Sequence, residues 1–158
     1  MYKEHKRLCV IIFIVIFAFT YYLQFNFKDI ASECISIISI ALAVYAICIS
    51  SLISSPLLEK LKTTVDIKLP HKTHLGVIKK YIQNAMMISI ITIVFSCIIK
   101  ITSYSVEKTI FENQALQELV SKINLYQIFS STCFGLFSLN FTFIWLIFIF
   151  IINRQIDK

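Results

Sequence analysis

IASECISIISIALAVYAICISSLISS, residues 30–55, is the stretch that decides the fold of this chain. It exceeds the roughly 20 apolar residues that a helix needs to cross a bilayer. Small residues recur along it at steps of three and four, which places all of them on one face of a helix. Isoleucine, leucine and valine fill most of the remaining circumference, so we expect a membrane helix with a small, weakly polar packing face. This face comprises Ser32, Ser36, Ser39, Ala43, Ala46, Ser50 and Ser54.

The composition of the whole chain is typical of a membrane protein. Hydrophobic residues make up 58% and charged residues 15% of the 158 residues, whereas soluble domains average about 45–50% apolar and about 25% charged residues. Only two glycines and two prolines interrupt the sequence, which favours long helices. The apolar runs lack the two-residue alternation of a transmembrane β-barrel. We therefore predict an all-α membrane protein.

Three more apolar runs complete a predicted bundle of four transmembrane helices in a single domain, residues 1–158. The first run follows a short basic tail, and bulky Tyr21 and Tyr22 stand where a signal peptide would carry small residues for cleavage, so we expect this helix to be retained. Because it has few small residues, we expect it to be the most lipid-exposed helix, packed outside a contact region of the other three. The predicted spans are residues 8–25, 30–55, 81–103 and 127–152.

Two polar segments separate the later spans. Residues 56–80 form a basic loop that contains Pro70. Residues 104–126 are more acidic, and their apolar side chains mostly follow helical steps. We predict an extra amphipathic helical segment here, between the third and fourth spans, lying on the membrane surface or extending the last span outward.

Basic residues are concentrated on one side of the predicted bundle. Three belong to the N-terminal tail, six to loop 56–80 and two to the C-terminal tail, whereas four lie on the other side. An excess of Lys and Arg in short loops marks the cytoplasmic face of a membrane. We predict that both termini and loop 56–80 are cytoplasmic, that segment 104–126 is external, and that the protein resides in the inner (plasma) membrane.

The basic loop predicts a partner of negative charge. Basic residues next to membrane helices attract anionic lipid headgroups, at about 1 kcal/mol for each Lys or Arg near the surface. A cytosolic protein is the alternative partner, and we expect no direct contact with nucleic acid. The residues proposed for lipid or partner docking are Lys60, Lys62, Lys68, Lys72, Lys79 and Lys80.

The sequence offers little for catalysis or for metal binding. His71 and His74 are three residues apart, but a metal site needs further ligands, so we predict that both are solvated loop residues. The five cysteines lie in or beside the apolar runs without a C-x-x-C pair, which predicts small buried side chains. No G-x-x-x-x-G-K, G-x-S-x-G or H-E-x-x-H motif is present. We expect neither an enzyme nor a cofactor or metal.

Small and hydroxylated residues also mark one face of the third and fourth spans. Membrane helices associate by close backbone approach through such residues, so three faces predict a single bundle within one monomer. The alternatives are a surplus face that drives self-association, and a wet pore lined by Ser and Thr around the axis of an oligomer. Asn140 is expected to bond across a helix interface, and lining a permeation path is the alternative. The packing or pore-lining candidates are Ser36, Ser39, Ser50, Ser89, Thr92, Ser96, Ser131, Gly135, Ser138 and Asn140.

Two charged residues fall inside the predicted spans, where a charge is costly. Glu33 and Lys100 lie near the outer ends of their helices, at comparable depth. They are candidates for an ion pair between helices. The alternative is that the Lys100 side chain extends to the outer interface, with its charged end in water.

Part of the chain resembles a class of small bacterial membrane proteins. Residues 36–61, SIISIALAVYAICISSLISSPLLEKL, precede a basic loop and then residues 78–95, IKKYIQNAMMISIITIVF. The hydropathy layout, and the serine-rich helix running into S-P-L-L-x-K-L, resemble four-span proteins that are commonly encoded in prophages and antiphage-defence neighbourhoods. The resemblance covers roughly residues 36–95. It implies a sensor or effector in defence at the inner membrane, often beside a soluble partner, and no catalytic residue.

Three functions compete on the sequence alone. The first is a non-enzymatic protein that senses or perturbs the membrane, as an oligomer or with a cytosolic partner. The second is a small channel or holin-like pore lined by the Ser and Thr residues. The third, a small-molecule transporter, is disfavoured because the spans hold few charges and the chain shows no inverted repeat.

Overall fold

The computed structural model describes residues 2–54, 57–66, 69, 71, 73–109 and 125–156. Nearly all of these residues are helical, which confirms the all-α prediction. An isolated antiparallel bridge joins Val65 to Thr73. The elements are α1 (Lys3–Tyr22), the short 3₁₀ helix η1 (Phe27–Ile30), α2 (Ala31–Ser54), α3 (Leu57–Thr63), α4 (His74–Thr109) and α6 (Leu125–Ile156).

Four of the helices are long and apolar enough to cross a membrane, which confirms the number of predicted spans. Several boundaries differ from the prediction, most of all two helix starts. The first helix already begins at Lys3, inside the basic tail, and the third begins at His74 rather than at residue 81. The candidate spans are Lys3–Tyr22, Phe27–Ser51, His74–Ile101 and Tyr126–Ile152.

Helix α1 ends at Tyr22, before the predicted residue 25, because the chain turns there. Gln24 has a positive φ of 54°, the left-handed conformation that commonly follows the end of a helix. The amide of Gln24 donates to the carbonyl of Tyr21 (3.3 Å), and the amide of Phe25 donates to that of Thr20 (3.1 Å). These two bonds form a Schellman motif, which satisfies carbonyls that the helix end would otherwise leave unpaired.

Helix α4 begins early because Thr73 caps it. The Thr73 hydroxyl accepts a hydrogen bond from the amide of Gly76 (3.3 Å), which satisfies one of the donors at the helix start. The helix then continues to Thr109, eight residues beyond the candidate span that ends at Ile101. Residues 110–124, which contain most of the predicted amphipathic segment, lie outside the described residues.

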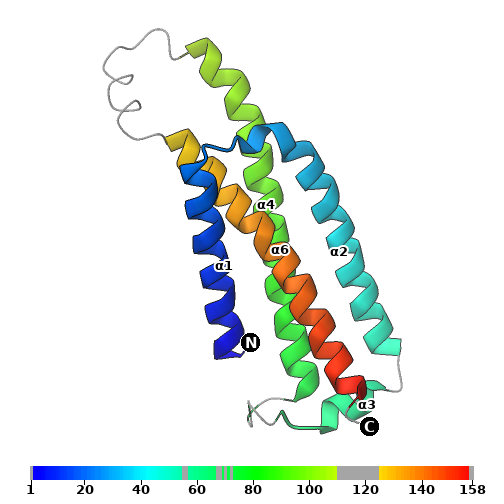
Figure 1. Cartoon of the computed structure of the whole chain (residues 1–158). Helices are drawn as coiled ribbons and strands as arrows, with labels where there is room; N and C mark the ends of the chain where they lie inside the picture. The colour runs from blue at the N-terminus through cyan, green and yellow to red at the C-terminus, as the bar shows by residue number, and fades with distance from the viewer. Residues whose placement is uncertain are drawn as a thin grey trace.

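The four long helices pack in the order α1, α6, α4, α2 (Figure 1). α6 lies between α1 and α4, and α4 lies between α6 and α2. The most apolar stretch of α1 is 11% buried, against 22% for α2, 33% for α4 and 44% for α6. The prediction that the first helix is the most exposed is confirmed. The other three helices do contact one another, but the first helix does not lie outside their contact region, because α1 packs directly on α6 while α2 packs mainly on α4.

The small-residue face of α2 points away from the bundle, which corrects the prediction made from residues 30–55. Every residue of that face is exposed. The inward face carries a different row of side chains, of which Ile38 and Tyr45 are the largest. The buried residues of α2 are Ala31, Cys34, Ile38, Ala41 and Tyr45, at alternating steps of three and four.

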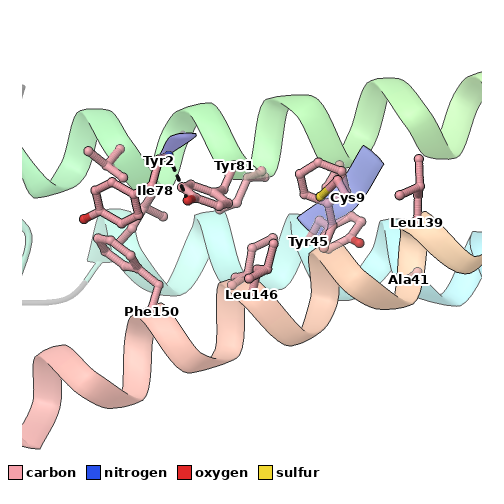
Figure 2. Packing of buried hydrophobic residues seen from close by; sticks show 14 residues of the cluster. Tyr2, Cys9, Ala41, Tyr45, Ile78, Tyr81, Leu139, Leu146 and Phe150 are labelled. Atoms are coloured by element: carbon pink, nitrogen blue, oxygen red, sulfur yellow. Dashed lines mark hydrogen bonds between the residues drawn. The ribbon is translucent and has the colours of Figure 1, made fainter. Parts of the chain in front are cut away.

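Two clusters of buried side chains hold the helices together. The larger one lies toward the chain termini and joins α1, α2, α4 and α6 (Figure 2). Tyr45 and Tyr81, each 1% exposed, are its largest fully buried side chains. The smaller cluster lies toward the other end and is built around Phe27, Cys34 and Cys133. The start of α1, helix α3, the start of α4 and the end of α6 lie at the same end of the bundle (Figure 1).

Candidate functional sites

Asn140 is the polar centre of the bundle. Its side chain is buried, and its amide nitrogen donates to the Thr92 hydroxyl (3.2 Å) and to the Leu136 carbonyl (2.9 Å). Its amide oxygen accepts from the Ser89 hydroxyl (2.5 Å). The Tyr45 hydroxyl donates to the Asn140 backbone carbonyl (3.3 Å). One residue of α6 therefore carries hydrogen bonds to both α4 and α2.

Three buried hydroxyls of α4 also bond within their own helix. Ser89, Thr92 and Ser96 are all fully buried, and each donates to the carbonyl four residues earlier, over 2.7–2.9 Å. Such bonds let a hydroxyl sit in an apolar environment without water. The face of α4 predicted from its small residues thus faces α6 and the interior of the bundle.

One small residue of α6, Gly135, contacts α1. A Cβ atom added at Gly135 would lie 2.7 Å from the Phe13 ring of α1, so the glycine permits this close approach. Ser138 donates to the Gly135 carbonyl (2.9 Å). Ser131 is fully buried, and its hydroxyl has no hydrogen-bond partner within the described part of the chain.

Three predicted packing residues of α2 face outward, so in the described part of the chain they do not pack against another helix. They are Ser36, Ser39 and Ser50. Their hydroxyls donate to the carbonyls four residues earlier, over 2.8–3.1 Å. The outward face therefore carries small side chains, and the serine hydroxyls at these three positions all have a hydrogen-bond acceptor. A lipid chain or another protein helix can cover it.

Glu33 and Lys100 do not form the predicted ion pair between their described side chains. The Lys100 ammonium instead donates to the hydroxyl of Ser32 (2.6 Å), one residue before Glu33. Both charged side chains are exposed. The contact still joins α4 to the start of α2, although the acceptor is a neutral hydroxyl.

A second polar site lies at the end of the bundle that carries the chain termini. Asp66, between α3 and α4, is fully buried, and the Tyr2 hydroxyl (2.5 Å) and His74 Nδ1 (3.1 Å) both donate to its Oδ2. The Leu69 amide donates to Oδ1 (3.0 Å). A buried carboxylate is tolerated only when several donors replace its hydration. We call this group, Tyr2, Asp66, Leu69 and His74, the end clamp.

Tyr81 extends the end clamp into α4. Its hydroxyl accepts from the Tyr2 amide (3.2 Å) and shares a hydrogen bond of 2.5 Å with Nδ1 of His5. The Phe150 ring of α6 lies 6.2–6.3 Å from the rings of Tyr2, His74 and Tyr81. Figure 2 shows Tyr2, Tyr81 and Phe150 gathered at this end. The clamp thus holds the N-terminus, the segment before α4 and two long helices together.

The end clamp corrects the prediction for one of the two loop histidines. His71 is exposed as predicted, whereas His74 is only 4% exposed. The bridge between Val65 and Thr73 places the following residues, Asp66 and His74, side by side. In the sequence Asp66 is one of two acids in an otherwise basic stretch, and its burial depends on Tyr2, which lies more than sixty residues away.

The opposite end has its own polar contacts between α6 and the α1–α2 connection. The Gln127 amide donates to the carbonyls of Thr20 (3.1 Å) and Phe25 (3.4 Å). The Ser130 hydroxyl donates to the Phe25 carbonyl (3.0 Å) and accepts from the Phe27 amide (2.8 Å). Both ends of the bundle are therefore fixed by hydrogen bonds as well as by packing.

The predicted docking lysines are only partly described. Lys62 is exposed on α3, and Lys79 and Lys80 are exposed on α4. Lys60 belongs to α3, whereas Lys68 and Lys72 lie outside the described residues. Lys79 and Lys80 border an open depression of about 400 Å³ whose other lining residues are His71, Thr73, Gly76 and Gln83.

The cysteines differ more in burial than the sequence predicts. Cys9, Cys34 and Cys133 are buried, Cys48 is half-buried and Cys97 is exposed. Within the described ranges, no group of three His, Cys, Asp or Glu side chains is arranged to hold a metal ion.

Comparison with protein-family models, with curated proteins and with solved structures finds no match to this chain.

Proposed function

We propose that the protein is a non-enzymatic, multi-pass protein of the inner membrane that senses or perturbs the bilayer as a homo-oligomer. Both termini and segment 57–73 are cytoplasmic in this proposal. Its support is the basic end of the bundle, where Lys62, Lys79 and Lys80 are exposed and where a Lys and Arg excess is expected on the cytoplasmic side. These lysines are available to anionic headgroups or to a cytosolic protein partner.

The observation that carries self-association is the outward small-residue face of α2. In the described part of the chain every residue of this face is exposed, although Ser32 at its start accepts a hydrogen bond from Lys100. Ser36, Ser39 and Ser50 leave no hydroxyl donor unsatisfied there. Small residues let two helix backbones approach closely, and this packing drives association in lipid, where no hydrophobic force operates between helices. A second copy of α2 is the partner that fits this surface best.

Bulky side chains on this face test the proposal. We expect Ser39→Leu/Ser50→Leu to shift the protein toward monomers, by about 1–2 kcal/mol in association free energy, because the leucines hold the two helices apart. The fold of each subunit is expected to persist, since both positions face outward. Energy transfer between labelled copies in liposomes measures the association.

The control variant is Ile37→Leu/Ile40→Leu, which changes exposed residues of α2 outside the small-residue face. It is expected to associate like the wild type. Undiminished association of Ser39→Leu/Ser50→Leu would place the contact between copies elsewhere. A wild-type protein that stays monomeric at high protein-to-lipid ratio would refute the homo-oligomer.

A small channel or holin-like pore is the second candidate, favoured by the row of hydroxyls on the same face. If several copies of α2 surround a common axis, Ser36, Ser39 and Ser50 line that axis. Ser89, Thr92 and Asn140 are poor candidates for the lining, because they bond to one another inside one subunit. Ion flux into protein-containing liposomes, abolished by Ser39→Leu/Ser50→Leu, is the expected result for a pore; oligomers without flux would exclude it.

A role in antiphage defence rests on the resemblance of residues 36–95 alone. In that role the end clamp would couple the spans to the cytoplasmic segment, since Asp66 joins both. Phage plating on cells with and without the protein tests this role, and unchanged plating across phages of different entry routes would count against it.

A further inference from the structure

The first turns of α1 combine three cations with aliphatic surface on one face. Lys3, Lys6 and Arg7 are exposed, and their spacing of three and four places them together on the helix. Val10 and Ile11 follow on the same side and are 50% and 58% exposed. These five residues line an open hollow of about 380 Å³.

This hollow faces away from the protein. The buried residues of α1, Cys9 and Thr20, lie on the side that meets α6. On the outward side the aliphatic surface continues beyond the hollow, through exposed Ile14 and Val15. A cationic rim followed by an apolar track matches the change from headgroup to hydrocarbon at a bilayer surface.

The three positive charges of the hollow also favour the binding of an anion. Like charges three and four residues apart on a helix repel one another, and cations at a helix N-terminus oppose the helix dipole. Glu4 is the acidic residue of this first turn, and it does not line the hollow. A bound phosphate would relieve both repulsions, and the guanidinium of Arg7 offers the paired donors that suit phosphate oxygens.

We propose that this hollow binds an anionic phospholipid, with its phosphate held by Lys3, Lys6 and Arg7 and an acyl chain lying along Val10, Ile11 and Ile14. Net negative charge on the headgroup distinguishes this lipid from a zwitterionic one, in which a quaternary amine offsets the phosphate. The inference rests on the proposed membrane embedding and is independent of self-association through α2.

Lipid retention by the full-length protein in detergent tests the site. Native mass spectrometry counts bound phosphatidylglycerol and, separately, bound phosphatidylcholine at equal concentrations. We expect the wild type to retain phosphatidylglycerol preferentially and Lys3→Gln/Arg7→Gln to lose about tenfold or more in that affinity, as expected for two cation–headgroup contacts. The matched control is Lys28→Gln/Lys100→Gln, which removes two exposed charges at the opposite end of the bundle, outside the hollow and outside the docking lysines, and should keep the preference.

Further variants separate charge from fold. Lys3→Arg/Arg7→Lys keeps both charges and is expected to retain phosphatidylglycerol, whereas Ile11→Gln keeps all three cations and should weaken retention by removing apolar surface. Equal losses in the hollow and control variants, equal retention of the two lipids, or displacement by millimolar inorganic phosphate would each overturn the site. If Ser39→Leu/Ser50→Leu loses association between copies but keeps the preference for phosphatidylglycerol, lipid binding at α1 does not depend on self-association through α2.

Discussion

Two buried serines in this bundle have opposite surroundings. Ser89 on α4 donates to the Asn140 amide oxygen (2.5 Å) as well as to its own helix, whereas the Ser131 hydroxyl on α6 has no partner among the described residues. Both side chains are fully buried. Residue type and burial are the same at both positions, so the difference lies in whether the facing helix supplies a hydrogen-bond acceptor for the hydroxyl. An unpaired buried hydroxyl costs about 1–3 kcal/mol, which a hydrogen bond across the interface avoids.

Alanine at each position measures this difference. We expect Ser131→Ala to leave the free energy of unfolding unchanged or to raise it by about 1 kcal/mol, since it removes an unpaired polar group. Ser89→Ala should lower it by about 0.6–2 kcal/mol through loss of the bond to Asn140. Reversible unfolding in mixed micelles gives both values. Equal destabilisation by the two substitutions would mean that the Ser131 hydroxyl has a partner in the membrane.

At the scale of elements, the α1–α6 contact depends on one missing side chain. Gly135 leaves room for the Phe13 ring, which a Cβ atom at this position would approach to 2.7 Å. Phe13 in turn stacks on Phe17, with ring centroids 6.2 Å apart, so its ring cannot move without disturbing a neighbour. Helix α1 has the smallest buried share of the four spans. Its attachment to the bundle is accordingly sensitive to this one contact.

Gly135→Ala is expected to lower the free energy of unfolding by about 1–3 kcal/mol, because the added methyl group overpacks the contact. Phe13→Leu should recover part of this loss in the double variant, since a smaller side chain vacates the space. The control is Ser138→Ala, three residues further along α6, because this substitution adds no atoms to the contact with Phe13. A double-mutant cycle with additive effects would contradict direct contact between the two positions.

At the scale of the whole molecule, polar contacts close both ends of the bundle. The end clamp gathers Tyr2, Asp66 and His74 from parts of the chain that are far apart in sequence, and Gln127 with Ser130 fixes the opposite connection. Between these ends the helices pack mainly through apolar and small residues, with Asn140 as the polar centre. This arrangement predicts that the segment before α4 moves as one unit with the N-terminus.

Asp66→Ala is expected to release that segment without unfolding the spans. The Tyr2 hydroxyl, His74 and the Leu69 amide lose their acceptor, and each hydrogen bond to a charged group is worth about 1.5–3 kcal/mol. Amide hydrogen exchange should become faster in residues 64–76 and unchanged in the centre of α4. Glu59→Ala, which removes an exposed acid from α3, should have no such effect. Unchanged exchange in Asp66→Ala would show that packing on Phe150 alone holds the segment.

The sequence by itself determined the number and helical nature of the spans, because apolar length and the scarcity of glycine and proline act locally. It also marked the small faces of α4 and α6, and Asn140 as a polar residue needing a partner. Only the tertiary structure decided which side of α2 faces inward, since the small stripe and the buried row through Ile38 and Tyr45 share one helical period. Burial of Asp66 and His74 was likewise set by contacts with Tyr2 and Phe150, which lie far away in sequence and carry no local signal.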